Sequence, residues 1–346
     1  MNQTFDALFP TLNTVSAHGL IRQAPEDFMV FEHNELNFTE SGEHLWLKVE
    51  KVNCNTAWVA TQISSACKVP ARQVGFAGLK DRHAITQQWF SVQLPKISDL
   101  AVIQAKLPAE VKIIECHWHK SKIKTGFLTY NEFKLRVRGI SSGQNQIEEN
   151  IEAVQLQGVP NYFGPQRFGH DMNNIEQAKD WFAGKIKVNN KNLRGLLIST
   201  ARSHIFNLIV AHRINNQTWH QVIPGDVLQL NASHSWFPAH EATTDELARR
   251  LSAFDLHITA AMWGEDPVQS TDQCAAIENQ IAKTQADYQA GFTTHRVKQD
   301  RRAIRIHPKE MTHQWDGNDL LIGFKLQAGA YATSILREVL QIAHDF

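Results

Sequence analysis

The stretch GFAGLKDRHAITQQWF, residues 75–90, sets three charged side chains into a tight turn between two apolar runs. Its two glycines allow the backbone to bend sharply or to approach a ligand closely. Lys80 and Arg82 flank Asp81, and neighbouring cations favour an ionised carboxylate by lowering its pKa. Such a carboxylate can act as a nucleophile without a metal. The alternative interpretation is a solvated turn whose ion pairs only support the fold.

Strand and helix patterns surround this turn in the first half of the chain. Residues 43–52 (EHLWLKVEKV) alternate in hydropathy, which predicts a half-buried strand. The following NTAWVATQISSACKV is typical of a helix, with Asn55 or Thr56 as its N-cap. The clearest strand is 131–139 (NEFKLRVRG), which has one apolar face and one basic face.

The character of the sequence changes near Gly158, where Gly, Pro, Asn and aromatic residues form an irregular stretch. Mostly helical patterns follow. Ser199 or Thr200 is placed to cap one helix, and Thr243 with Glu246 forms a capping box for another. Strand patterns return at RAIRI and DLLIGFKLQAG, before a C-terminal helix. The order predicts an α+β protein interrupted by a mainly helical insertion.

The composition bounds the class of protein. The chain has 346 residues, of which 42% are hydrophobic and 20% charged, as expected for a globular protein of two domains or one large core. It contains no run of eighteen uncharged apolar residues and no secretion signal at its N-terminus, so we expect no membrane partner. The four cysteines are scattered, without a C-x-x-C pair, which favours the reducing cytoplasm.

The net charge is zero, but its distribution is uneven. Residues 117–138 hold six Lys/Arg against one acid, and residues 294–311 hold six against two. Two basic segments in a neutral chain predict a positive surface of the kind that binds a phosphate backbone. Two solvated faces without a ligand are the alternative.

Residues 77–86 resemble the signature of the TruD family of tRNA pseudouridine synthases, an A-G-x-K-D-(R/K)-x-A-x-T turn around an aspartate. Further stretches resemble family elements in family order and cover nearly the full chain: APEDFMVFE (24–32), NCNTAWVA (53–60), NEF (131–133), GVPNYFGPQRFG (158–169), ARSHIFN (201–207), RRAIRIHP (301–308) and AGAYATSILRE (328–338).

The resemblance implies both the architecture and the reaction. It implies a pseudouridine-synthase catalytic domain with a mixed or antiparallel sheet at 1–157 and 305–346, and a family-specific insertion domain at 158–304. It implies that the protein converts a uridine of its partner tRNA, usually uridine 13, to pseudouridine. Asp81 then supplies the catalytic carboxylate without a cofactor. Attack on C1′, addition to the ring and abstraction of a sugar proton all remain open as its step.

The resemblance also indicates residues that bind the substrate or support the active site: Arg22, Phe28, Lys80, Asn131 and Phe133. Relatives often carry Lys at the position of Arg22, so the cation is kept as a partner for Asp81. Aromatic side chains commonly receive flipped bases, which is the role implied for Phe133. Strand alternation alone places Phe133 in the core with Leu135 and Val137.

The RNA backbone contacts predicted from the basic segments and the resemblance are all arginines: Arg136, Arg138, Arg167, Arg202, Arg301 and Arg302. Surface salt bridges are the alternative for each. One departure from the family follows Arg167: His170–Asn173 (HDMN) replaces a glycine-rich turn. Asp and Asn tolerate left-handed backbone better than most residues, so we expect the turn to survive.

Other functions have weaker support. Cys116, His117 and His119 are close in sequence, but on a strand the cysteine points away from the histidines, so we expect no metal site. No nucleotide-binding glycine motif is present. A non-catalytic RNA-binding or RNA-folding protein with a structural Asp81 is the second hypothesis, and a metal-dependent RNA hydrolase is the third. We infer no obligate protein partner.

Overall fold

The computed structural model describes residues 4–94, 100–231, 233, 235–239 and 243–343. The chain divides into two compact units, each described here by itself. The sheet unit comprises the described residues of 16–148, 308–332 and 340–346, and the helical unit those of 1–15, 149–307 and 333–339. The division into a catalytic domain (1–157 and 305–346) and an insertion (158–304) stays a prediction.

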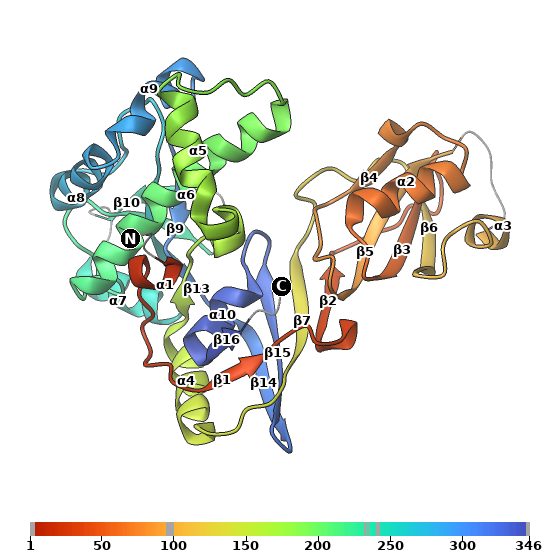
Figure 1. Cartoon of the computed structure of the whole chain (residues 1–346), viewed down its shortest axis with the longest axis horizontal. Coiled ribbons are helices and arrows are strands. Elements are labelled where there is room, and N and C mark those ends of the chain that lie inside the picture. The colour runs from red at the N-terminus through yellow and green to blue at the C-terminus, as the bar shows by residue number, and fades with distance from the viewer. Residues whose placement is uncertain (1–3, 95–99, 232, 234, 240–242, 344–346) are drawn as a thin grey trace. The chain divides into compact units, whose positions relative to one another are not determined.

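An eight-stranded sheet dominates the sheet unit (Figure 1). Its order is β14 (Lys309–Asp316), β15 (Asp319–Gln327), β7 (Tyr130–Val137), β2 (Phe28–His33), β5 (Ile85–Gln93), β3 (His44–Val52) and β6 (Val111–His119), with β4 (Val74–Phe76) paired to β5. All neighbours are antiparallel except β2 and β5. The α+β class and the mixed sheet are therefore confirmed, as are the strands predicted at 43–52 and 131–139.

Helix α2 (Thr56–Ala66) packs on one face of β3 and β5 (Figure 1). Asn55 caps it, since the Asn55 side chain accepts a hydrogen bond from the Trp58 amide at 2.7 Å. The apolar face of β3 predicted from alternation packs against this helix. Trp46 points to the opposite face, yet it is buried with Trp89, because a second apolar cluster covers the strand there. The strand is thus buried on both faces at this point.

The remaining elements of the sheet unit are short: β1 (His18–Leu20) paired with β16 (Gln341–Ala343), the 3-10 turns Pro25–Asp27 and Ala71–Gln73, and α3 (Leu100–Gln104). Helix α4 (Gln144–Gln157) runs from this unit into the helical unit.

The helical unit contains α1 (Phe5–Leu8), α5 (Asn173–Phe182), α6 (Lys191–Asn215), α7 (Thr244–Ser252), α8 (Asp272–Lys283) and α9 (Gln289–Thr294), and most of α10 (Ala332–Val339). It also contains a four-stranded sheet of β10 (Trp236–Pro238), β9 (Val227–Leu230), β11 (Leu256–Met262) and β12 (Asp300–Ala303), and the pair β8 (Val159–Pro160) and β13 (Arg305–Ile306). The sequence predicted a mainly helical insertion, and this four-stranded sheet was not predicted. Its central strand β11 is buried almost throughout, so it shows no alternation in hydropathy.

Two helix starts predicted for this unit had different outcomes. The prediction for α6 was wrong: the helix begins at Lys191, and Asn190 caps it by accepting from the Asn192 and Leu193 amides. Ser199 and Thr200 lie inside the helix. The prediction for α7 is confirmed, since Thr243 accepts from the Glu246 amide at 3.4 Å.

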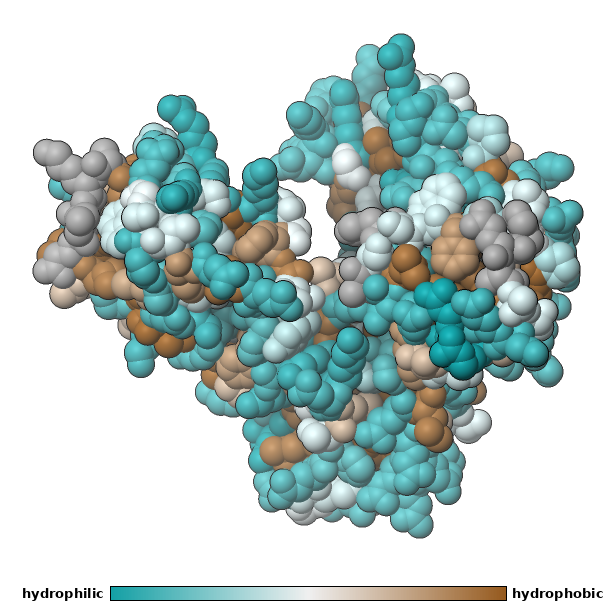
Figure 2. Space-filling model, turned by 180° about the vertical axis from the view of Figure 1, so that it is seen from behind, coloured by the Kyte–Doolittle hydropathy of each residue, from teal (hydrophilic) through white to brown (hydrophobic). Residues whose placement is uncertain are grey.

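Across the described residues, no helix has both the length and the hydropathy needed to span a bilayer. Figure 2 shows one face of the molecule, on which hydrophilic residues predominate and apolar residues gather in small patches.

Candidate active site

Five polar side chains share one face of the sheet near the turn that holds Asp81. They are Glu32 on β2, Lys51 on β3, Thr86 and Gln88 on β5, and Asn131 on β7, and all are buried. Strand register aligns them: Glu32 lies opposite Asn131, and Lys51 opposite Thr86. We call this set the polar row. Buried polar groups are stable only when they bind partners, so the row predicts hydrogen bonds to the turn.

The polar row and α2 fix the backbone of the turn before Asp81. The Gln88 side-chain amide donates to the Gly78 carbonyl at 3.2 Å. The Lys80 amide donates to the Thr56 hydroxyl at 2.9 Å, and that hydroxyl donates to the Gln88 carbonyl oxygen at 2.9 Å. Residues 78–80 are therefore held by one connected network at both ends.

Lys51 fixes the turn at a further point. Its Nζ donates to the backbone carbonyls of Cys54 at 2.6 Å and Asp81 at 2.8 Å, and the residue is fully buried. Burial lowers the pKa of Lys51 from 10.5 to about 8, although the nearby Cys54 and Asp81 oppose the shift. Sequence reasoning missed this residue. The signal was present, because position 51 continues the apolar alternation of Leu45, Leu47 and Val49.

Lys80 turns inward, to the sheet. Its Nζ donates to the Asn131 side-chain oxygen at 2.8 Å and lies 3.1 Å from the Glu32 carboxylate. Its side chain is 5% exposed and that of Glu32 is not exposed at all, so this is a buried ion pair. Glu32 is the counter-charge of Lys80.

Asp81 points outward and pairs with a different cation. Its side chain is 48% exposed, and its Oδ1 accepts from the Arg22 guanidinium at 3.2 Å. The Arg22 guanidinium also lies over the Phe28 ring at 4.1 Å. Burial lowers the pKa of Arg22, and the charge of Asp81 opposes that shift. Arg22 has a φ of +61°, a left-handed conformation that costs energy for a residue with a side chain.

Phe133 lies on the same face of β7 as Asn131, so it belongs beside the polar row. It is 5% exposed, and its ring centroid lies 6.3 Å from that of Phe28 and 5.5 Å from that of Phe324. The structure thus brings together Arg22, Phe28, Lys80, Asp81, Asn131 and Phe133. A stacking role for Phe133 stays a prediction.

The basic face of β7 is largely neutralised. Arg136 binds Asp316 at 2.7 Å and Asp319 at 2.9 Å. Arg138 binds Asp27 at 2.7 Å. These acids come from other segments, so counting charge along the sequence overestimated the positive surface.

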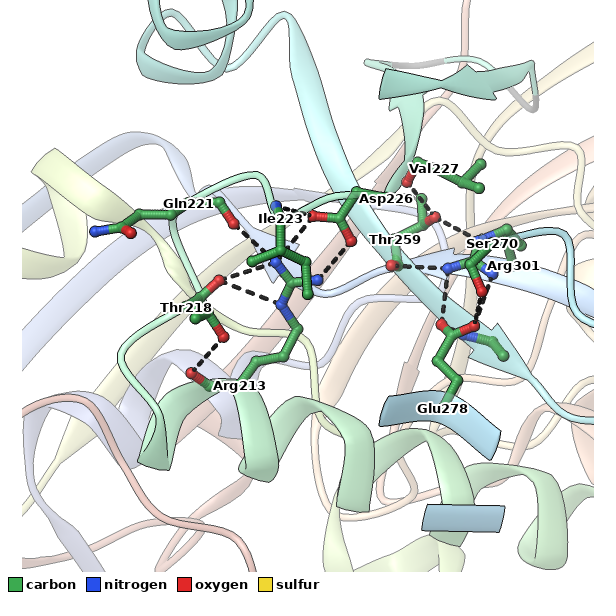
Figure 3. A network of polar contacts seen from close by, with 11 residues as sticks. Arg213, Thr218, Gln221, Ile223, Asp226, Val227, Thr259, Ser270, Glu278 and Arg301 are labelled. Carbon is green, nitrogen blue, oxygen red and sulfur yellow. Dashed lines mark hydrogen bonds and ion pairs between the residues drawn. The ribbon is translucent and has the colours of Figure 1, made fainter. Parts of the chain in front are cut away.

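Arg301 is the clearest correction among the predicted RNA contacts. Its side chain is 1% exposed, and its guanidinium binds the Glu278 carboxylate and both the hydroxyl and the carbonyl of Thr259 (Figure 3). A second buried pair, Arg213 with Asp226, lies nearby (Figure 3). A phosphate cannot reach a guanidinium enclosed in this way, so the prediction for Arg301 is wrong.

The other three arginines of the helical unit that were predicted to contact RNA also bind groups of the protein. Arg202 donates to the backbone carbonyls of three residues, Met262, Trp263 and Lys298. Arg302 donates to Asn161 at 2.6 Å and lies over the Phe163 ring at 4.4 Å. Arg167 donates to the Ser199 hydroxyl at 3.1 Å, while its carbonyl accepts from Thr200. These contacts give Ser199 and Thr200 partners inside α6.

The departure at 170–173 is accommodated by left-handed backbone. Asp171 and Met172 have φ of +50° and +59°. Asp tolerates this region comparatively well, whereas Met does so at a cost. Asn53, in the NCN stretch near Lys51, also has a positive φ of +55°.

The Cys116–His119 stretch has no metal-like arrangement. His117 lies between the carboxylates of Glu40 at 2.7 Å and Glu115 at 2.8 Å. Burial lowers the pKa of His117, but its hydrogen bonds to these two carboxylates outweigh that effect and raise it. Within the described part of the chain, no group of three His, Cys, Asp or Glu side chains is arranged to hold a metal.

The family model described as tRNA pseudouridine synthase D (TruD) matches residues 9–175 and 170–339. A tRNA pseudouridine synthase D of Aeromonas salmonicida is 39% identical over 328 residues, covering 94% of this chain and 92% of that protein. One from Vibrio vulnificus is 37% identical over 343 residues, covering 99% and 98%.

A solved structure also has a similar fold. The putative tRNA pseudouridine synthase D of Methanosarcina mazei aligns with a TM-score of 0.72 at 20% identity, covering 95% of each chain. At this identity the likeness concerns the fold alone.

Proposed function

The chain belongs to the TruD family of tRNA pseudouridine synthases, and we propose that it isomerises a uridine of tRNA, uridine 13, with Asp81 as the catalytic carboxylate. The observation that supports this most directly is the way the turn is built. Lys51, Thr56 and Gln88 hold its backbone from the sheet side, while the Asp81 side chain stays 48% exposed beside Arg22. Such preorganisation is what a reacting group needs.

The proposed reaction breaks the N1–C1′ bond of the uridine and forms a C5–C1′ bond. The hydrogen on C5 leaves as a proton, and N1 gains a proton, so no atom is added or lost overall. No oxidant, reductant or cofactor enters this balance. The base has to leave the helical stack to reach the carboxylate.

The surrounding residues have supporting roles in this proposal. Arg22 neutralises and orients the Asp81 carboxylate, and Phe28 supports the Arg22 guanidinium. Lys80 and Asn131 anchor the turn, and the Phe133 ring contacts the flipped base. In this proposal the catalytic domain is 1–157 with 305–346, and 158–304 is the insertion domain.

Only part of the predicted RNA backbone surface belongs to this proposal. Arg136 and Arg138 are partly exposed, so a phosphate can replace one of their carboxylate partners. Arg167, Arg202 and Arg302 are kept as weaker candidates because they already bind protein groups. The proposed enzyme acts on tRNA in the cytoplasm, in keeping with its four thiols, none of which is in a disulfide.

The decisive experiment measures tritium release from tRNA transcripts labelled at uracil C5, for wild type and Asp81→Asn, with EDTA present. We expect release by the wild type alone, with similar tRNA affinity for both proteins. Equal release by Asp81→Asn removes Asp81 from the mechanism. No release by the wild type, with tRNA still bound, supports a non-catalytic RNA-binding protein instead.

A further inference from the structure

Leu79 is an apolar side chain placed in water next to the proposed catalytic carboxylate. It is 75% exposed, although leucine is among the residues most often buried. It lies two positions before Asp81, a separation of at most about 7 Å between Cα atoms. Scattered exposed leucines are normal, so its exposure alone carries no argument.

Hydrogen bonds fix the backbone on both sides of Leu79, so its side chain cannot turn toward the protein interior. The carbonyl of Gly78 on one side and the amide of Lys80 on the other are both bound by the network of Gln88 and Thr56. Lys80 next to it has its side chain fixed in a buried ion pair. Leu79 is thus held outward by a rigid support, unlike a leucine on a mobile loop.

The space next to Gly78 is open. A Cβ built on Gly78 meets no atom within 4 Å, and this glycine has no positive φ. Neither packing nor backbone strain within the described chain therefore requires a glycine at this point. The remaining physical reason for such a glycine is the close approach of a ligand to the backbone. Rigid support, an exposed apolar tip and open space occur together beside Asp81.

We propose that Leu79 is a wedge that enters the RNA stack and fills the place left by the target uridine when its base flips toward Asp81. This inference rests on the proposed function. Extruding a base costs a few kcal/mol of lost stacking. An apolar side chain that contacts the faces of the two neighbouring bases recovers part of that cost, as leucine and other apolar wedges do in bent duplexes. Leu79 thereby acts on the flipping step and contacts the substrate directly.

The test compares Leu79→Ser and Leu79→Met with the wild type in single-turnover pseudouridine formation at saturating tRNA. We expect Leu79→Ser to lower the rate by about tenfold to a hundredfold, as loss of one leucine contact implies. Leu79→Met, which keeps an apolar side chain of similar size, should retain most of the rate. Melting temperatures should stay unchanged, because the side chain is exposed.

The matched control is Leu156→Ser on α4, since Leu156 is exposed to a similar extent, 79%, and belongs to a different unit. It should leave the rate unchanged. A rate for Leu79→Ser within twofold of the wild type would refute the wedge.

A binding experiment separates this inference from the proposed function. 2-Aminopurine is placed next to the target uridine, and its fluorescence is followed on binding Asp81→Asn with Leu79 intact or replaced by Ser. We expect a fluorescence change that depends on Leu79. Equal signals refute the wedge even if the wild-type enzyme is active. A wild type that forms no pseudouridine refutes the proposed function, whatever the signals show.

Discussion

Lys51 holds the backbone carbonyl of Asp81 from the sheet side of the turn, with 2.8 Å between its Nζ and the carbonyl oxygen. The lysine is fully buried and its two bonded acceptors are both carbonyls, so its charge has no bonded carboxylate. Cys54 and Asp81 both favour the charged form of Lys51 and oppose the lowering of its pKa. The turn that holds Asp81 and a buried cation are thus physically linked.

We expect this link to appear in the pH dependence. As pH rises through about 8, Lys51 loses its proton and Asp81 loses a nearby positive charge. The rate should then fall several-fold above pH 8, as a single-turnover pH profile will show. Lys51→Arg stays charged, so its profile should lack that decline. Lys48→Arg, on the other face of the same strand, serves as control, and an identical decline in all three proteins contradicts the link.

The same shift has a defined effect on stability. In the unfolded chain Lys51 keeps its proton up to about pH 10.5, but in the folded protein only up to about pH 8. Between these values the unfolded state binds more protons, so this group makes the free energy of unfolding rise with pH. Other groups titrate in both proteins, so the test is the difference between them: the free energy of unfolding of wild type minus that of Lys51→Met, from urea unfolding, should be larger at pH 9.5 than at pH 7.

The buried pair of Lys80 and Glu32 should dominate the stability of the turn. Lys80→Met leaves an unpaired buried carboxylate, which should cost about 3–5 kcal/mol in the free energy of unfolding. Replacing Glu32 by Gln as well should recover part of this cost. The control is Lys134→Met, whose pair with Glu132 is partly exposed and should be worth less than about 1 kcal/mol. Equal losses in denaturant titrations of the two single variants would argue against a buried pair.

Arg22 should act through its charge at Asp81. Arg22→Lys keeps a cation within reach and should retain most of the rate, whereas Arg22→Met should lower it by about tenfold. Both variants lose part of the contact with Phe28, so comparing them isolates the charge. Rates are measured by tritium release at saturating tRNA. A Lys variant as slow as the Met variant would show that the planar guanidinium itself is required.

Arg301 should matter for folding and not for RNA. Arg301→Met leaves the buried Glu278 carboxylate without its cation and should lower the free energy of unfolding by about 3–5 kcal/mol. The slope of tRNA affinity against salt should remain that of the wild type, because no phosphate contact is lost. Arg249→Met, at an exposed position of α7, is the stability control. A shallower slope of tRNA affinity against salt for Arg301→Met would show that Arg301 does contact a phosphate.

Local pattern was sufficient for several elements. Period-two hydropathy predicted β3 and β7, because a strand between a core and a polar environment sorts its side chains by face. Asn55 and Thr243 marked helix starts because a cap depends on residues within one turn. Local pattern did not predict the start of α6 or the strand β11. The cap of α6, Asn190, lies nine residues before Ser199, where the cap was expected, and β11 is buried on both faces.

The sequence by itself determined the family and the turn that carries Asp81, since both depend on motifs of residues that are close along the chain. The mixed sheet followed from the resemblance to the family. Only the tertiary structure decided which charges meet. Glu32 pairs with Lys80, Arg22 with Asp81, and Glu278 with Arg301, all across long sequence separations. A charge is neutralised by whatever folds within a few ångströms of it, and strand register and burial set that distance.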